Sequence, residues 1–132
     1  MRIYIAAPWQ CKAQAQKAAA ALRREGHCIV STWFEGVDEA DAYNETTYRA
    51  HAERDLSELG NADTLVVLNL EKSEGKAVEF GVALDAFMRL VVIGQRSHVN
   101  IFHYLQTVEH FETLDAFIEA ERYATAATHG GR

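Results

Sequence analysis

The stretch ADTLVVLNL, residues 62–70, is the most apolar run of the chain and decides the fold. It lacks the alternation of apolar and polar residues that marks a strand with one face in water. A continuous apolar run of this length, followed by a turn at Glu71–Gly75, is typical of a strand covered on both faces. Such strands occur mainly in parallel sheets, so the stretch predicts an α/β protein.

Strand-like and helix-forming runs alternate on both sides of this strand. We expect further strands at Arg2–Ala7, His27–Thr32 and Leu90–Gly94, with a weak fifth one at Val108–Phe111. Helices are expected at Gln10–Glu25, Glu45–Leu59, Lys76–Met88 and Leu114–Tyr123, with Gly26 ending the first. This order predicts one three-layer α/β domain, flavodoxin-like or Rossmann-like, with about five parallel strands and helices on both faces. The domain is expected to cover residues 1–123, and residues 124–132 to form a frayed tail.

Length and composition fit a single domain and exclude several classes of partner. The chain has 132 residues, of which 48% are hydrophobic and 24% charged, and its net charge is −6. Because Lys and Arg form no basic block, we expect no polymeric nucleic acid as a partner. No apolar run approaches the ~18–20 residues that span a bilayer, and no leader precedes the first strand. We therefore expect a cytoplasmic protein with no membrane partner.

Sequence signatures of cofactor and metal sites are missing. The chain contains no GxGxxG, GxxxxGK[ST], HExxH or GxSxG pattern. Cys11, Cys28 and the six histidines show no spacing typical of metal ligands. We expect no cofactor, no metal and no Ser or Cys nucleophile.

Ligands of parallel α/β sheets bind outside the carboxyl ends of the strands. After the central strand, Ser73 offers a hydroxyl, Gly75 allows close approach of the backbone, and the following helix points free N–H groups outward. This turn is a candidate cradle for one phosphate group. An ordinary strand-to-helix connection would have the same residues, so that interpretation stays open beside it.

Two carboxylates flank the central strand. Glu79 lies among apolar neighbours at the start of the helix that leaves it, and Asp55 lies on the helix that leads into it. Glu79 could simply be an acid favoured by the helix dipole, and Asp55 part of a solvated face. If both reach one cleft, they form the pair of acids that cleaves glycosidic bonds, one as nucleophile and one as acid and base.

Aromatic side chains follow the first two strands. Trp9, Trp33 and Phe34 could stack on a nucleobase or pack at the rim of the sheet. Tyr4, near the carboxyl end of the first strand, could serve the site or only the core.

The residues together resemble a known enzyme family. The matching stretches are RIYIAAP at 2–8, Arg54-Asp55-Leu56, NADTLVV at 61–67, SEGKAVEFGVAL at 73–84 and LVV at 90–92. With these stretches the chain resembles the nucleoside 2-deoxyribosyltransferase superfamily, including its 2'-deoxynucleoside 5'-monophosphate N-glycosidase branch, over roughly residues 1–105.

The resemblance implies a role for each matching residue. Glu79 falls on the nucleophile that attacks C1' of the sugar, and Asp55 falls on the acid that assists departure of the base. Tyr4 falls on a tyrosine that contacts the nucleophile. Ser73 and Gly75 fall on the loop that holds the 5'-phosphate in the hydrolase branch, whereas the transferase branch has an acid at the position of Ser73.

The loop after the first strand departs from the family pattern. Its Pro8 and Trp9 are expected to line the substrate site, but the loop lacks the arginine that some hydrolases use for phosphate. Lys12 or Lys76 would have to replace that arginine.

The resemblance also implies a homodimer or larger assembly with shared active sites. A neighbouring copy would contribute residues from the region 96–103, for which Ser97, Asn100 and His103 are the candidates.

The function implied is hydrolysis of the N-glycosidic bond of a 2'-deoxynucleoside 5'-monophosphate through a covalent glutamyl-sugar intermediate. A base-exchanging deoxyribosyltransferase and a nucleotide-binding module without turnover remain as alternatives, as does cleavage of another N-glycoside. The partner expected in each case is a small-molecule nucleotide or nucleoside.

Overall fold

The computed structural model of the chain describes residues 1–36, 44–96 and 100–130. Its elements, in which η marks a short 3-10 helix, follow the order β1 (Arg2–Ala6), η1 (Trp9–Cys11), α1 (Lys12–Arg24), β2 (Cys28–Ile29), α2 (Glu45–Gly60), β3 (Thr64–Leu68), α3 (Glu74–Asp85), β4 (Arg89–Ile93), η3 (Ile101–Tyr104), β5 (Val108–Phe111) and α4 (Leu114–Gly130). This is the alternation of strands and helices that the sequence predicts.

The strands form a five-stranded parallel sheet in the order β2-β1-β3-β4-β5. Tyr4 of β1 lies opposite Leu65 of β3, and Leu65 lies opposite Leu90 of β4. All residues of β3 are buried, because it is the central strand and both of its faces are covered. The predicted α/β fold with about five parallel strands is confirmed.

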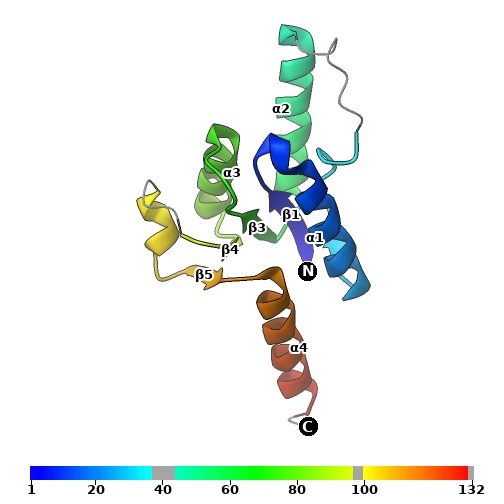
Figure 1. The fold of residues 1–132 in the computed structure, drawn as a ribbon, viewed down its shortest axis with the longest axis vertical. Helices are drawn as coiled ribbons and strands as arrows, with labels where there is room; N and C mark the ends of the chain where they lie inside the picture. The colour runs from blue at the N-terminus through cyan, green and yellow to red at the C-terminus, as the bar shows by residue number, and fades with distance from the viewer. Residues whose placement is uncertain (37–43, 97–99, 131–132) are drawn as a thin grey trace.

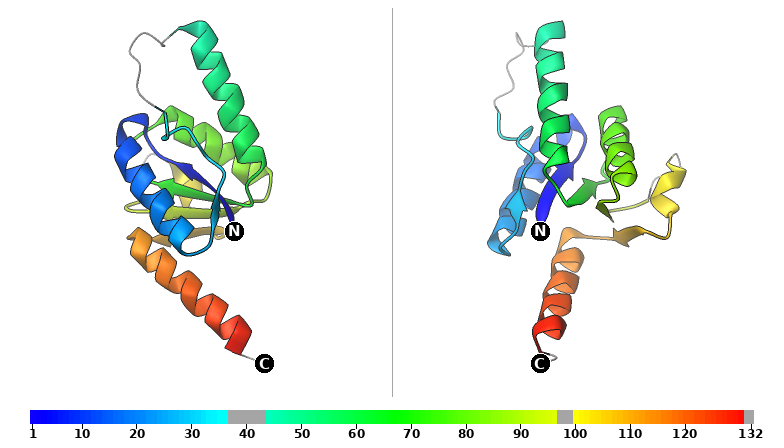
Figure 2. Two further views of the ribbon diagram at one scale, coloured as in Figure 1. Left: turned by 90° about the vertical axis from the view of Figure 1, so that its right-hand side faces the viewer. Right: turned by 180° about the vertical axis from the view of Figure 1, so that it is seen from behind.

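Helices cover both faces of this sheet (Figure 1, Figure 2). α2 and α3 lie on one face, and α1 and the first turns of α4 lie on the other. An ion pair of 2.5 Å between Arg122 of α4 and Glu25 after α1 joins the two helices of the second face. From β1 the chain runs outward to β2 and returns through α2 to β3, so the strand order reverses between β1 and β3. In α/β folds this point of reversal is where ligands bind.

The edge strand β2 is shorter than the predicted His27–Thr32 because side chains replace its ladder. The backbone N–H of Ile5 in β1 donates to the Ser31 hydroxyl at 3.0 Å. The indole N–H of Trp33 donates to the backbone carbonyl of Ile5 at 2.7 Å. These two bonds satisfy the backbone N–H and carbonyl of Ile5, which β2 no longer pairs after Ile29. They also fix the Trp33 ring at the carboxyl end of β1.

Helix α3 begins earlier than the sequence predicts. The Ser73 side chain accepts a hydrogen bond of 3.2 Å from the backbone N–H of Lys76, so Ser73 is the N-cap and the first helical residue is Glu74. Glu79 consequently lies in the second turn, beyond the free N–H groups that favour an acid at a helix start. The helix dipole therefore does not explain a carboxylate at this position.

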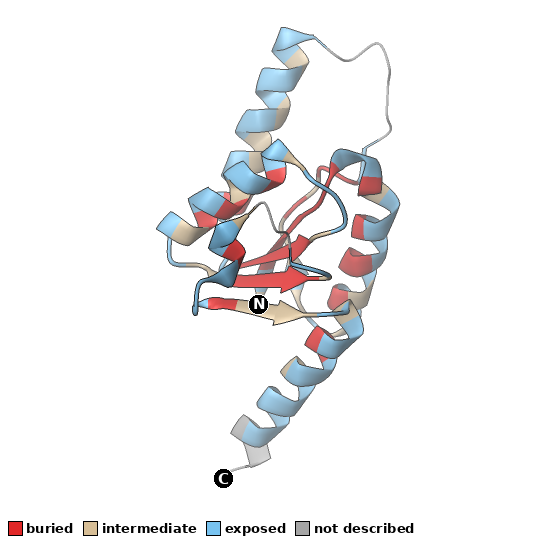
Figure 3. Cartoon of the chain, turned by 60° about the vertical axis from the view of Figure 1, so that its left-hand side comes forward, coloured by how far each residue is buried: buried red, intermediate tan, exposed pale blue. Residues whose placement is uncertain are grey.

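The tail predicted after Tyr123 is helical instead of frayed, because α4 continues to Gly130. Ala124, Ala126 and Ala127 are the strongest helix formers and extend it. Of its residues up to 127, Phe117 and Ile118 are buried, and Figure 3 shows the exposed turns that follow them projecting from the sheet. No helix within the described ranges is long and apolar enough to cross a bilayer.

The positive φ of Gly26, at the end of α1, can be tested by substitution. Gly26 has φ +90° and is followed by the backbone bond from His27 N–H to Leu22 O that closes a helix C-terminus. We expect Gly26→Ala to lower the free energy of unfolding by about 1 kcal/mol, because an L residue resists positive φ. Urea unfolding measures this change.

Gly60→Ala is the matched control. Gly60 is the last residue of α2, and a Cβ there, as at Gly26, meets no atom within 4 Å. Alanine should leave stability unchanged or raise it at this position. Equal losses at both glycines would refute the conformational explanation.

Candidate functional site

A hydrogen bond between β1 and α3 marks the centre of the site. The hydroxyl of Tyr4 donates to Oε2 of Glu79. The Tyr4 residue has no exposed surface, so its ring packs in the core while its hydroxyl reaches the carboxylate. The ring of Tyr4 is thus a core residue whose hydroxyl contacts Glu79, and a role in a reaction stays a prediction.

The environment of Glu79 favours its protonated form. Burial raises the pKa of Glu79 to about 7, and the negative charge of Asp55 adds to the rise, while the hydrogen bond from Tyr4 lowers the pKa. The pKa of the Tyr4 phenol is raised as well. Burial and the Glu79 charge raise the pKa of Tyr4, which keeps the hydroxyl a donor at all ordinary pH values.

Asp55 reaches the same place from α2. It is partly buried, and Arg54 donates to its Oδ1 through Nε at 3.1 Å and a terminal nitrogen at 2.9 Å. Burial raises the pKa of Asp55, against the lowering effect of Arg54 and of the more distant His51. The carboxyl group is thus drawn toward its neutral form although a guanidinium contacts it.

A cleft of about 140 Å³ brings most of the predicted residues together. Its walls are Ala7, Trp9, Trp33, Asp55, Ser73, Gly75, Lys76 and Glu79. The cleft lies at the carboxyl ends of β1 and β3, where the strand order reverses. Its volume is below the ~300–1,000 Å³ of most small-molecule pockets, so a nucleotide would extend beyond it.

The aromatic residues separate into two groups. Trp9 is 39% exposed and lies with its ring centroid 5.9 Å from that of buried Trp33, so both can border a ligand. Phe34 is 1% exposed and packs edge-on against Trp33 at 5.4 Å, away from the cleft. The prediction of a stacking role for Phe34 is corrected, because its ring belongs to the core.

Pro8 also lies outside the cleft lining. It is buried, and its carbonyl accepts a 2.9 Å bond from the backbone N–H of Cys11, which starts η1. Pro8 therefore directs Trp9 toward the cleft without bordering it.

In the turn after β3, the Ser73 side chain is the N-cap of α3. The Ser73 oxygen accepts from the Lys76 N–H, and its hydroxyl hydrogen remains to donate. A Cβ at Gly75 would meet only Ser73 Oγ, at 3.8 Å, so this glycine leaves open space next to the cleft.

His51 is a neighbour of the cleft that sequence reasoning missed. Its ring stacks on Trp9 with centroids 6.4 Å apart and an interplanar angle of 27°. The sequence holds a signal for it, since His51 precedes Asp55 by four positions and therefore shares its face of α2.

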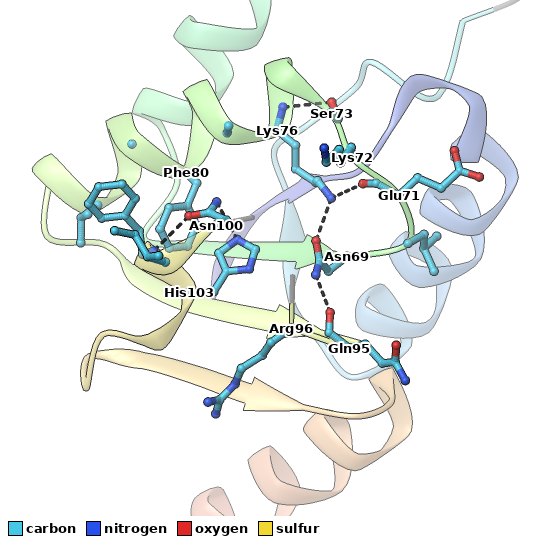
Figure 4. Close-up of a pocket in the computed structure, with 16 residues that line it drawn as sticks. Asn69, Glu71, Lys72, Ser73, Lys76, Phe80, Gln95, Arg96, Asn100 and His103 are labelled. Atoms are coloured by element: carbon cyan, nitrogen blue, oxygen red, sulfur yellow. Dashed lines mark hydrogen bonds between the residues drawn. The ribbon is translucent and has the colours of Figure 1, made fainter. Parts of the chain in front are cut away.

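Asn100 and His103 lie elsewhere, in a second and larger cavity of about 610 Å³ between α3 and η3 (Figure 4). Within one chain they do not join Glu79. Their contribution to a neighbouring copy stays a prediction, and Ser97 lies outside the described residues.

Lys76 and Ser73 line both cavities, whereas Lys12 bonds the carbonyl of Gly36. The described residues contain no cluster of His, Cys, Asp or Glu suited to a metal ion.

This fold is also found in a deoxyribosyltransferase and an N-glycosidase. The first is the 2-deoxyribosyltransferase of Bacillus psychrosaccharolyticus, with a TM-score of 0.69 and 16% identity over 89% of this chain and 90% of that one. The second is the CMP N-glycosidase BcmB of Clostridium botulinum, with a TM-score of 0.60 and 14% identity over 93% and 99%. At these identities the likeness shows the fold. No protein-family model and no curated protein matches the sequence.

The raised pKa of Glu79 makes stability depend on pH. A carboxyl whose folded pKa is about 7, above its unfolded value of 4.5, stabilises the fold fully below pH 4.5 and loses this contribution as pH rises through 7. We expect Glu79→Gln to remove the loss. Relative to wild type, the variant should gain about 1–3 kcal/mol of unfolding free energy between pH 4.5 and 8.

Urea unfolding at several pH values measures the effect. Glu74→Gln, an exposed position on the same helix, controls for removal of one charge. A constant difference between Glu79→Gln and wild type across this range would show that Glu79 is not held in its protonated form.

Proposed function

We propose that the chain hydrolyses the N-glycosidic bond of a 2'-deoxynucleoside 5'-monophosphate and releases the free base and deoxyribose 5-phosphate. The observation that carries the proposal is the pair of carboxylates, Glu79 and Asp55, in one cleft at the reversal point of the sheet. The likeness in fold to a 2-deoxyribosyltransferase and to a CMP N-glycosidase supports a glycosyl-transfer or glycosidase reaction of this kind.

Glu79 is the proposed nucleophile. Tyr4 holds Oε2, which leaves Oε1 to attack C1' of the sugar. As the Oε1–C1' bond forms, the bond from C1' to the base nitrogen breaks and its electron pair leaves with the base. The phenol hydrogen bond favours the ionised carboxylate, while burial removes the water that would shield it.

Asp55 is the proposed acid and base. In the first step its proton passes to the departing base, and in the second it takes a proton from water. The water oxygen bonds to C1', the ester bond to Glu79 breaks, and its electron pair returns to the carboxylate. Burial, which raises the pKa of Asp55, supports the protonated form that the first step requires.

The turn at Ser73 and Gly75 is the proposed phosphate site. A neutral serine beside open space leaves room for a dianion, and its hydroxyl can donate. Because the cleft of about 140 Å³ is too small to enclose a nucleotide, we also propose that a second copy of the chain closes it.

Base exchange is the second candidate, favoured by the deoxyribosyltransferase of like fold. In that reaction a second base takes the place of water and attacks the same ester. Adding adenine to a reaction with a deoxynucleoside or deoxynucleotide would yield a new nucleoside or nucleotide only if the ester transfers to bases.

Substitution of the nucleophile tests the main proposal. Glu79→Gln and Glu79→Ala should lower the rate of base release by at least about 1,000-fold, because no ester can form. Asp55→Asn should lower the rate by about 100- to 10,000-fold, because no proton reaches the base. Liquid chromatography of free bases from nucleosides, ribonucleotides and deoxynucleotides measures these rates and the substrate class.

Asp85→Asn, at the exposed far end of the same helix as Glu79, should retain activity and serves as the control. Mass spectrometry of acid-quenched enzyme should detect the sugar ester on wild type. Base release by Glu79→Ala at the wild-type rate would exclude the mechanism.

Phosphate recognition can be tested by adding one charge at Ser73. Ser73→Asp should preserve the cap of α3, since Asp caps helices as well as Ser does. It should repel a 5'-phosphate, so kcat/KM for the monophosphate should fall by about tenfold or more relative to that for the nucleoside. Ser73→Asn keeps the cap without the charge and should not change the preference in this way. Equal effects of both variants would place the phosphate elsewhere.

A further inference from the structure

The larger cavity, between α3 and η3, has no role in the proposed reaction. Its volume of about 610 Å³ falls within the range of small-molecule sites. It lies next to the carboxyl ends of β3 and β4 and is bordered by Asn69 and Gln95, which follow those strands. Glu79 and Asp55 do not line it, whereas Ser73 and Lys76, at the start of α3, line both this cavity and the cleft.

One wall of the cavity carries the buried cation Lys76, whose pKa the charge of Cys11 would raise against the effect of burial. Lys76 is 6% exposed, and its ammonium donates to Asn69 Oδ1 at 2.9 Å and to the backbone carbonyl of Glu71 at 2.5 Å. Both acceptors are neutral, and within residues 1–36, 44–96 and 100–130 no carboxylate forms an ion pair with it. Burial lowers the pKa of Lys76, which is the cost of a charge held in this way. The ammonium has a third N–H with which to bind an anion.

The opposite wall carries a buried donor without an acceptor. His103 is 4% exposed, and its Nε2 lies 3.1 Å from the side-chain nitrogen of Asn100. Asn100 Oδ1 accepts the backbone N–H of Phe102, so the amide nitrogen is the atom that donates to Nε2. In the neutral ring the proton therefore lies on Nδ1, which is buried and has no partner among the described residues.

The electrostatic surroundings of His103 are positive. Burial, Lys76 of α3, Arg96 after β4 and His110 of β5 all lower the pKa of His103, and no acid among the residues that the structure describes opposes them. His103 of η3 and Lys76 of α3 thus line the same cavity (Figure 4), although Nδ1 of His103 is itself buried. An unpaired buried donor costs ~1–3 kcal/mol, and a bound anion would relieve that cost for both groups.

Apolar groups form the rest of the cavity. Phe80 is nearly buried and lies 5.0 Å from the His103 ring, between centroids. Phe102 borders the cavity from η3 and is 53% exposed. On α3, Gly81 presents no side chain, and a Cβ there would meet no atom within 4 Å. This leaves a surface suited to a flat hydrocarbon group.

We propose that this cavity is a second ligand site, for a small organic anion whose oxygens accept from Lys76 Nζ and His103 Nδ1. The flat apolar part of the ligand packs against Phe80 and Phe102. Aromatic phosphates and carboxylates share this chemistry. Neither Glu79 nor Asp55 contributes to this site, although Ser73 and Lys76 are shared with the cleft.

Phenylphosphonate is the probe, with inorganic phosphate for comparison, and the nitrogen resonances of the His103 ring are the readout. The free protein should show the Nδ1–H tautomer. Phenylphosphonate should bind saturably, shift Nδ1 and raise the pKa of His103, because an anion favours the imidazolium. It should bind about tenfold or more tightly than phosphate, since the ring adds apolar contact. Absence of a saturable shift at His103 overturns the proposal.

Variants locate the binding. His103→Phe and Lys76→Met should each weaken binding by about tenfold or more, measured by calorimetry, whereas Lys17→Met on exposed α1 should not. Gly81→Leu should block the cavity and raise helix propensity, so it tests the site even if Lys76→Met fails to fold.

Glu79→Gln separates this cavity from the cleft. Binding that survives Glu79→Gln and is lost in Gly81→Leu supports a separate site. Binding lost in Glu79→Gln and retained in Gly81→Leu would place the anion in the cleft and overturn the proposal, as would binding that no variant changes.

Discussion

The hydrogen bond from Tyr4 to Glu79 is the constraint on which the site depends. It joins β1 to α3, the helix that follows the central strand β3, across the point where the strand order reverses. Burial raises the free energy needed to ionise the Glu79 carboxyl, and the hydrogen bond from the Tyr4 phenol lowers it without adding a charge. The carboxyl group is therefore held near the balance between its two forms at neutral pH, and one oxygen is left toward the cleft.

The fold was predictable because its strongest signals are local. The uninterrupted apolar run of β3 indicates a strand covered on both faces, and Gly26 indicates where α1 ends. The boundaries that differ depend on side-chain bonds that periodicity does not show. Ser73 begins α3 early by capping it, and Ser31 and Trp33 end the ladder of β2 by bonding β1 themselves.

The site was predictable where motif residues lie close to the central strand. Glu79, Asp55 and Ser73 flank β3 in sequence and meet in the cleft. Phe34 and His103 show the limit of this reasoning, because an aromatic or imidazole ring near a strand end can turn toward the core, the cleft or another cavity. Ring packing decides which way the side chain turns. The Phe34 ring packs against Trp33, and the His103 ring packs against Phe80, which is distant in sequence.

The pairing of β1 with β3 also sets the order in which the molecule can be completed. Tyr4 and Glu79 are 75 positions apart, and the strand opposite β1 begins only at Thr64. Contacts between residues so far apart in sequence close large loops. The chain therefore loses conformational entropy before the contacts stabilise it. During synthesis on a ribosome, the first strand leaves the exit tunnel long before its central neighbour exists. The nascent chain must keep that strand soluble until β3 and α3 have followed, and only then can the carboxylate of Glu79 meet the phenol of Tyr4.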